Sequence, residues 1–498
     1  MLKKILLLTA GLLVACSITV SASVPYESFT YSYWGAEMPA PQAYIPAATI
    51  SGSDLGTSPL SSPADVFVSS RQEIYLVDTG NNRILKLNSS YELEMVIAEF
   101  EVQGERQAFN GPQGVFVTAE DTIYVADTEN SRIVVLDQQG EVLKIFTAPE
   151  SEILPDDFVY KPQKLVLDNA GRMYVLSINC NQGIIQLSAD GSFDGFIGAN
   201  KVTPSPLDVI WKRFATAEQR KKMALFVPTE YNNLAIDSSN FIYATTDKMS
   251  ASGVYDAVLN RSADSSYAPV RKLNLTGTDI MRRAGYFPVV GDVNFTLTND
   301  GSSASGPSTI VDVAVDVSGM FSILDSHRCR VFTYDNDGNL LFVFGGKGDA
   351  RGLFQTPVAL AYMDTQYMVL DQTSGALTVF ERTEYGELIQ SAIEEQNEGN
   401  MEKATQHWED ILRMNKNYDL AYEGIGKARL QENDYKGAME YFELAYNRTY
   451  YSKAFQLYRK EVVGQYFGPV ATIVVGCVLV GTVAVAVIRR HKRRAASK

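Results

Sequence analysis

Residues 112–146 read PQGVFVTAEDTIYVADTENSRIVVLDQQGEVLKIF, a succession of short apolar runs separated by turns. Apolar and polar residues alternate within the runs, Val, Ile, Tyr and Phe are frequent, and Gly, Asp and Asn mark the turns. This pattern is typical of consecutive β-strands. The chain repeats it about six times, with copies that begin at Pro63, Pro112, Pro162, Tyr231, Thr309 and Pro357.

A repeat of this length indicates a solenoid, a propeller or an array. One copy cannot bury its sheet alone, so the copies must pack against one another. They are spaced by roughly 50 residues, with longer gaps after the third and fourth, which fits a four-stranded blade with its loops. The sequence therefore predicts a mainly β protein in which six blades pack face to face around an axis.

Three copies also share an Asp that is followed five residues later by Arg and then by Ile or Val. These pairs are Asp78 with Arg83, Asp127 with Arg132, and Asp325 with Arg330. Together with the preceding Pro-x-Gly-Val type of strand, the motif closely resembles the NHL-repeat β-propeller family, over about residues 26–381. The resemblance implies a six-bladed propeller, placed here at residues 26–383. We interpret the recurring Asp and Arg as a structural pair rather than as catalytic groups.

A closed ring needs a joint between its first and last blades. Residues 26–34, YESFTYSYW, alternate Phe29, Tyr31 and Tyr33 on one face and precede the first copy by a loop. We expect this segment to form the outer strand of the last blade. Such closure hides sheet edges that would otherwise favour aggregation.

The first 22 residues are typical of a secretory signal peptide. Two lysines near the start are followed by an apolar run and then by small residues, with cleavage expected after Ala22. The stretch 13–16, LVAC, is also similar to a bacterial lipoprotein processing box, which would acylate Cys16. We favour simple cleavage, because the chain carries a second candidate anchor.

That anchor is a predicted transmembrane helix at residues 466–488. The run 469–488 contains no charged residue, and at about 1.5 Å per residue it spans roughly 30 Å, the thickness of a bilayer core. Residues 489–498 form a basic tail, and positive residues remain on the cytoplasmic side. The sequence thus predicts a single-pass type I protein of the cell membrane whose propeller is extracytoplasmic.

Charge and cysteine content restrict the partners and the stabilising chemistry. The chain has a net charge of −14, which becomes about −22 without the eight basic residues of the signal segment and the tail. An exterior this acidic argues against DNA or RNA as a partner. Of the four cysteines, Cys180 and Cys329 alone lie in the predicted exported part. They fall in blades that are not neighbours, so no disulfide is expected.

Helical spacing replaces the β pattern over residues 385–465. Two passages, 398–412 and 432–446, align with an offset of 34 residues and resemble tetratricopeptide repeats. The aligned pairs are Ala404 with Ala438, Trp408 with Phe442, and Ile411 with Ala445. Two interpretations stay open: a groove that docks a peptide or another membrane protein, or a stiff spacer between propeller and bilayer.

The opening position of each first strand is expected to line the central channel. These positions are Asp65, Gly114, Lys164, Asn233, Asp312 and Ala359. The polar members Asp65, Lys164, Asn233 and Asp312 are candidates for a small polar ligand or for Ca²⁺, as in lactonase-type propellers. We favour ordinary channel lining and no resident cofactor, because the Lys164 ammonium would oppose a cation.

Few residues in the sequence indicate catalysis. His327 is the single histidine of the predicted propeller, whereas metal-dependent lyases of propeller type gather several imidazoles around the channel. The sequence contains no nucleophile elbow, P-loop or His/Cys cluster. A binding function is therefore favoured over an enzymatic one. The rival is a surface lactonase or hydrolase that uses a channel metal at Asp65, Asn233 and Asp312, and a third hypothesis is recognition of cell-wall polysaccharide by aromatic residues.

Two insertions depart from the repeat. In residues 205–230, Thr216 and Gln219 form a capping box that predicts a short helix. Its candidate partner-binding residues are Trp211, Lys212, Arg213, Arg220, Lys221 and Lys222. On an acidic exterior this basic helix is a candidate contact site, and the alternative is an amphipathic plug packed on the propeller. The second insertion, about 271–306, contains Arg282 and Arg283 and has a Gly/Ser-rich end, GSSASGP, that is expected to form a flexible loop.

We therefore expect a membrane-anchored protein that binds a membrane protein complex or a surface ligand. The order of an NHL-like propeller, helical repeats and one transmembrane helix resembles bacterial surface proteins that accompany polytopic membrane partners. The resemblance implies carbohydrate ABC transporters among those partners.

Overall fold

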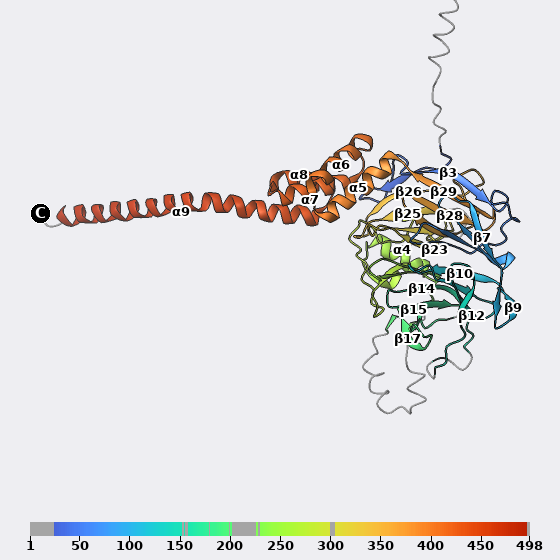
Figure 1. The fold of residues 1–498 in the computed structure, drawn as a ribbon. Coiled ribbons are helices and arrows are strands. Elements are labelled where there is room, and N and C mark those ends of the chain that lie inside the picture. Colours follow the sequence, from blue (N-terminus) through green and yellow to red (C-terminus); the bar gives the residue numbers. More distant parts are fainter. Residues whose placement is uncertain are drawn as a thin grey trace, which may run out of the picture. The chain divides into compact units, whose positions relative to one another are not determined.

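Six antiparallel sheets follow one another along the chain in the computed structural model (Figure 1). The structure describes residues 24–151, 154, 158–178, 180–198, 200–201, 226–227, 230–298 and 304–495. Among these residues, five of these six sheets have four strands and the fourth has three, and three further sheets (β1-β2, β8-β9 and β18-β19) have two strands each. The protein is thus a six-bladed β-propeller followed by a helical C-terminal segment, and the fold class predicted from the repeat is confirmed.

Each blade is a simple up-and-down meander. Blade 1 contains β4 (Asp65–Val68), β5 (Ile74–Asp78), β6 (Arg83–Leu87) and β7 (Leu93–Ile97); blade 2 contains β10 (Pro112–Val117), β11 (Ile123–Asp127), β12 (Arg132–Leu136) and β13 (Val142–Phe146); blade 3 contains β14 (Pro162–Leu167), β15 (Met173–Ser177), β16 (Ile184–Leu187) and β17 (Phe193–Ile197). Blade 4 contains β20 (Asn233–Ile236), β21 (Ile242–Thr245) and β22 (Val270–Leu273); blade 5 contains β23 (Ile310–Val315), β24 (Phe321–Asp325), β25 (Arg330–Tyr334) and β26 (Leu340–Phe344); blade 6 contains β27 (Pro357–Met363), β28 (Gln366–Asp371), β29 (Ala376–Arg382) and β3 (Tyr44–Ser51).

The ring is closed by β3, so the prediction that residues 26–34 form the closing strand is wrong. β3 pairs antiparallel with β29 along its whole length, from Tyr44 opposite Arg382 to Ser51 opposite Ala376. Residues 26–34 contain the three-residue strand β1 (Phe29–Tyr31), which pairs with β2 (Glu37–Pro39) instead. The longer strand can satisfy more backbone groups of β29, which explains why it occupies the outer position.

Two of the three predicted Asp/Arg pairs are present as structural ion pairs. The Arg83 and Arg132 Nε atoms each donate to their aspartate at 2.7 Å. The other carboxylate oxygen of Asp78 accepts the backbone N–H of Ser61 and so ties the turn to the chain entering the blade. The pairs therefore stabilise loops, with their carboxylates fully buried and their guanidinium groups slightly exposed.

In the third pair, in blade 5, the Asp and the Arg each contact a different partner. Asp325 lies 3.6 Å from Arg328, and the Arg330 guanidinium lies 3.5 Å from Asp292. Asp292 also receives the Arg328 Nε at 2.9 Å. Because the segment that follows blade 4 supplies this extra carboxylate, the motif alone did not predict the partner.

Blade 4 carries insertions that differ from the prediction. Between β21 and β22 lies α4 (Ala251–Leu259), a helix that the repeat pattern did not reveal. The insertion expected at 271–306 begins later, since Arg271 belongs to β22. Arg282 and Arg283, which lie in this insertion, contact Asp337 at 3.1 Å and Asp279 at 2.8 Å, respectively. The first three residues of the predicted flexible end, GSSASGP, lie outside the described residues.

Residues 31–38 and 387–498 form a second compact unit. The helices of the C-terminal segment are α5 (Glu384–Glu398), α6 (Met401–Met414), α7 (Asp419–Gln431), α8 (Tyr435–Leu444) and α9 (Arg448–Ala495). Trp408 and Phe442, which the 34-residue offset pairs, are both buried. Gly424 and Gly426 make room for them, because a Cβ at these positions would lie 2.3 Å from Trp408 and 2.7 Å from Phe442.

α9 is long and apolar enough to cross a membrane (Figure 1). Its most apolar stretch has a mean hydropathy of 2.7 and none of that stretch is buried by other described residues. Exposed Tyr466 and Phe467 come directly before the uncharged run. The predicted signal peptide, residues 1–22, lies outside the described part of the chain.

Candidate functional site

The first strands of the six blades line a central channel, and their opening residues occupy equivalent positions. Each of them lies opposite a residue near the end of the second strand of its blade. Asp65 pairs with Val77, for example, and Asp312 pairs with Leu324. In four blades a register shift immediately precedes this residue. Such bulges change the direction of side chains near the rim of a closed sheet. The repeat thus builds a ring of side chains from six distant segments.

Asp65 and Lys164 form an ion pair inside this ring. The Lys164 ammonium donates to Asp65 Oδ1 at 2.5 Å, although the two residues belong to blades 1 and 3. The carboxylate also accepts the N–H groups of Val66 at 3.0 Å and Val115 at 3.1 Å. Asp65 therefore links blade 1 both to its neighbour and to the blade beyond.

Asn233 and Asp312 make similar links between later blades. Asp312 accepts the N–H of Val313 at 2.7 Å and that of Leu360, in blade 6, at 2.6 Å. Asn233 donates its amide to the carbonyl of Val311, in blade 5, at 3.1 Å. We call Asp65, Lys164, Asn233 and Asp312 the channel clasp, because all four connect blades at the axis.

The clasp contains two carboxyl groups and one ammonium. Asp65, Lys164 and Asp312 are 1%, 8% and 2% exposed. Burial raises the pKa of Asp312 to about 7, although Lys164 and the two backbone N–H donors limit the rise. Burial opposes the charged form of Lys164, but Asp65 and Asp312 outweigh this effect and raise its pKa. The channel thus contains a permanent cation beside a carboxyl that titrates near neutrality.

The contacts of the clasp do not fit a divalent cation. Every carboxylate oxygen of Asp65 and Asp312 already accepts a hydrogen bond, and Asn233 Oδ1 accepts the N–H of Leu234. The Lys164 ammonium, 2.5 Å from Asp65 Oδ1, would also repel a cation bound to this carboxylate. Across the described ranges, no group of three or more His, Cys, Asp or Glu side chains is arranged to hold a metal ion.

Two cavities flank the clasp. The first, the amide cavity, has a volume of about 400 Å³ and lies where the first strands begin. Its lining is polar and mostly uncharged, with Gln113, Gln163, Asn232 and Gln372 around it. The second, the apolar cavity, has a volume of about 330 Å³ and lies toward the ends of the same strands. Lys164 lines both, so the clasp separates the two cavities.

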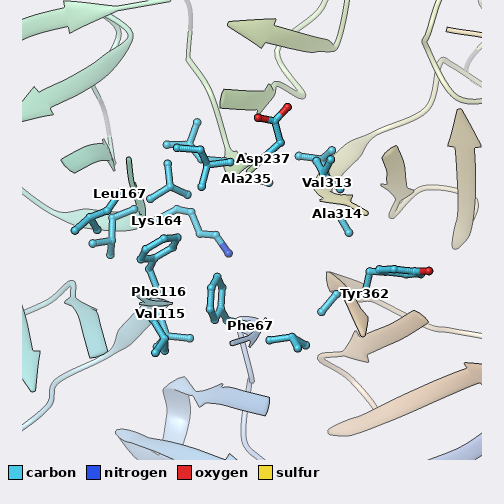
Figure 2. Close-up of a pocket in the computed structure, with 18 of the residues that line it drawn as sticks. Phe67, Val115, Phe116, Lys164, Leu167, Ala235, Asp237, Val313, Ala314 and Tyr362 are labelled. Carbon is cyan, nitrogen blue, oxygen red and sulfur yellow. The ribbon is translucent and has the colours of Figure 1, made fainter. Parts of the chain in front are cut away.

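The apolar cavity is walled mainly by hydrocarbon. Figure 2 shows Phe67 and Phe116 beside the end of the Lys164 side chain, with Val313 and Ala314 across the cavity. The rings of Phe67 and Phe116 have centroids 5.1 Å apart. A channel of this kind can accept an apolar molecule, and the charged clasp forms its floor.

The apolar cavity was not predicted, although the sequence contains a signal for it. Side chains two residues apart on a strand share a face. The residues that follow the ring positions by two are Phe67, Phe116, Val166, Ala235, Ala314 and Ala361, and all six line this cavity. α4 also had a signal, since Ser250 caps the helix and Val254 and Val258 lie on one face of it.

The remaining predicted residues lie elsewhere. The candidate contact residues Trp211, Lys212, Arg213, Arg220, Lys221 and Lys222 lie outside the described residues. Cys180 and Cys329 are buried free thiols, and burial raises the pKa of each to about 11. Thiols of this kind are inert, so they contribute no nucleophile.

The titration of Asp312 predicts a pH-dependent stability. An unfolded aspartate loses its proton near pH 4, whereas Asp312 in the folded chain keeps its proton up to about pH 7. The folded state therefore binds more protons between these values, and the free energy of unfolding falls as pH rises, by up to about 1.4 kcal/mol per pH unit. The free energy of unfolding can be measured at several pH values by unfolding the chain in urea and digesting the unfolded fraction with a protease. Asp312→Asn should remove this part of the dependence on pH.

Asp364→Asn, in an exposed turn of blade 6, is the matched control and should keep the wild-type slope. If the free energy of unfolding depends on pH in the same way in the wild type and the Asp312 variant, the titration of Asp312 does not cause this dependence.

One family model matches part of the propeller. A family model described as NHL repeat matches residues 109–136. No curated protein sequence matches the chain. Solved structures with a similar fold include a streptogramin B lyase (12% identity, 69% of this chain and 100% of that chain, TM-score 0.38), virginiamycin B lyase from Staphylococcus aureus (9%, 68% and 99%, 0.37) and a putative gluconolactonase (12%, 72% and 98%, 0.38). Similarities this weak carry no information about the activity of this chain.

Proposed function

We propose that this protein is a membrane-anchored binding protein that holds a partner at the outer face of the cell membrane. The observation that carries the proposal is an open groove in the helical unit, with a volume of about 630 Å³. It is lined by Glu409, Leu412, Arg413, Lys416, Tyr422, Ile425, Glu440, Tyr441 and Leu444. Apolar side chains flanked by charges of both signs suit a peptide segment of another protein.

The packing of the helices supports a tetratricopeptide-like interpretation of residues 385–465. All six aligned positions are buried, and the two glycines of α7 let Trp408 and Phe442 approach its backbone. Repeats of this kind present a concave surface beside the helices that they pack together. A docking groove is therefore favoured over a simple spacer.

α9 supports the proposed location. Its apolar stretch, with Tyr466 and Phe467 before it and the basic residues 489–494 after it, suits a helix that spans a bilayer with its C-terminal end in the cytoplasm. The propeller and the groove are then extracytoplasmic, in agreement with the signal peptide predicted at residues 1–22. The partner class that fits is an exposed segment of a membrane protein complex, including a carbohydrate transporter. The basic helix predicted around residues 211–222 is a second candidate contact.

We do not propose a hydrolase with a channel metal. Its ligands would be Asp65, Asn233 and Asp312, whose oxygen atoms are engaged with backbone N–H groups and with Lys164. Releasing them would break links between blades. Binding by surfaces outside the clasp requires no such change.

Crosslinking in intact cells tests the proposal. Leu412 and Leu444 line the groove, and Leu444 is 54% exposed. Replacing both with Glu should abolish the main protein adduct of the full-length chain, because charged side chains would be buried in the contact. Met414→Glu is the matched control, since this residue is 45% exposed on α6 but does not line the groove.

The control should retain the wild-type adduct. An unchanged adduct in the Leu412 and Leu444 variant would refute docking in the groove. In that case, loss of the adduct on changing Arg220, Lys221 and Lys222 to Glu would assign the contact to the basic insertion instead.

A further inference from the structure

The Lys164 ammonium has hydrogen-bonding capacity that the protein does not use. A lysine ammonium carries three N–H donors, and among the residues that the structure describes it has one acceptor, Asp65 Oδ1. The residue is 8% exposed and lines both cavities, so its other two donors face either cavity water or an acceptor that displaces this water. Figure 2 shows this nitrogen beside Phe67, among the side chains that line the apolar cavity. A buried donor of this kind favours an acceptor that enters the cavity.

The walls of the cavity define the rest of such a ligand. Phe67, Phe116, Leu167 and Val313 offer hydrocarbon surface, and Ala235 and Ala314 leave space because their side chains are small. The volume of about 330 Å³ falls within the range of small-molecule sites. Asn169, Asp237 and Asn240 also line the cavity, so the part of the ligand that lies against the hydrophobic side chains is apolar and of the size of one or two aromatic rings.

The charges of the clasp exclude an acidic ligand. The ammonium is already paired with Asp65, and Asp312 is close enough to raise the lysine pKa. A ligand carboxylate would place a third acidic group around one cation in a desolvated site, which is unfavourable. A cationic ligand would meet the ammonium itself. A neutral acceptor, such as the carbonyl of a ketone or an ester, carries neither penalty.

We propose that the apolar cavity binds a small, uncharged apolar molecule whose carbonyl oxygen accepts a hydrogen bond from Lys164. The site is separate from the helical groove and does not depend on the partner proposed above. The ligand lies against Phe67 and Phe116, and the clasp limits how deeply it enters.

Benzophenone is a suitable probe, because it is neutral, carries a carbonyl and inserts into nearby C–H bonds on irradiation. The full-length chain in lipid nanodiscs is irradiated with benzophenone, and adducts are located by mass spectrometry of peptides. Adducts are expected in the strand segments that line the cavity, β4, β10 and β23. Adducts in α9, formed by benzophenone dissolved in the lipid, serve as an internal standard.

Filling the cavity provides the first control. Ala235→Leu and Ala314→Leu together should lower the cavity adducts about tenfold and leave those in α9 unchanged, because the added side chains occupy the ligand volume without touching the clasp. Gln372→Ala, in the amide cavity, should change neither the adducts in the apolar cavity nor those in α9. If the filled protein proves unstable, the competition below tests the site in the wild-type chain.

Three competitors of similar size test the chemistry. Methyl benzoate, which is neutral and has a carbonyl, should suppress the cavity adducts at concentrations about tenfold lower than propylbenzene, which has no acceptor. Benzoate should not compete. If propylbenzene competes as well as methyl benzoate, Lys164 does not donate a hydrogen bond to the ligand. If benzoate competes most strongly, the clasp does not exclude acidic ligands. If the wild type forms no adducts in the cavity, the cavity does not bind such molecules.

Discussion

Replacing Lys164 with methionine is expected to destabilise the propeller by about 3–5 kcal/mol. The substitution leaves Asp65 and Asp312 buried without their cation, at 1% and 2% exposure. It also removes the link between blades 1 and 3, because Lys164 donates to Asp65 at 2.5 Å. Urea unfolding of the full-length chain, followed by proteolysis of the unfolded fraction, measures the loss.

Two variants make this result specific. Lys161→Met removes a lysine three residues earlier whose ion pair with Glu129 is largely exposed, and it should cost less than about 1 kcal/mol. Adding Asp65→Asn to Lys164→Met should recover much of the loss, because one of the unpaired charges disappears. If Lys164→Met is no more harmful than Lys161→Met, the clasp does not stabilise the ring.

Tyr44→Ala is expected to cost about 3–5 kcal/mol and to loosen the closure of the ring. Tyr44 lies at the start of β3 and is 1% exposed. Its ring packs against Phe342 and Phe344 of blade 5, with centroids 5.4 and 5.3 Å away, and against Tyr367 at 4.8 Å. Removing it opens a cavity between blades 5 and 6 where the two ends of the propeller meet.

Hydrogen–deuterium exchange gives the local measurement. Backbone amides of β29, which pairs with β3, should exchange faster in Tyr44→Ala, since separation of β3 exposes them. Ile45→Ala is the control, because the neighbouring side chain is 40% exposed on the other face of the same strand. Equal acceleration in both variants would show that the aromatic contacts do not hold the closing strand.

The sequence predicted the parts of the structure that depend on local periodicity. Alternation with a period of two, repeated six times, predicted six blades, and the equivalent opening positions identified the residues of the channel clasp. Helical spacing beyond Glu384 and the uncharged run at 469–488 predicted the helices, which the structure contains as α5 to α9. In each case a single segment determines its own strand or helix, because the side-chain pattern must match the backbone period.

The remaining features depend on residues that are distant in the sequence. Lys164 and Asp65 are 99 residues apart, and β3 pairs with β29 across more than 300 residues. Arg330 contacts Asp292 rather than Asp325, although its own blade has the repeat motif. One repeat alone does not show whether residues 26–34 or β3 form the closing strand. It also does not show the chemistry of the apolar cavity, which six repeats build together. Such contacts are decided by which side chains the closed ring brings together at the axis and at the joint, where burial makes each unpaired charge and unpaired strand costly.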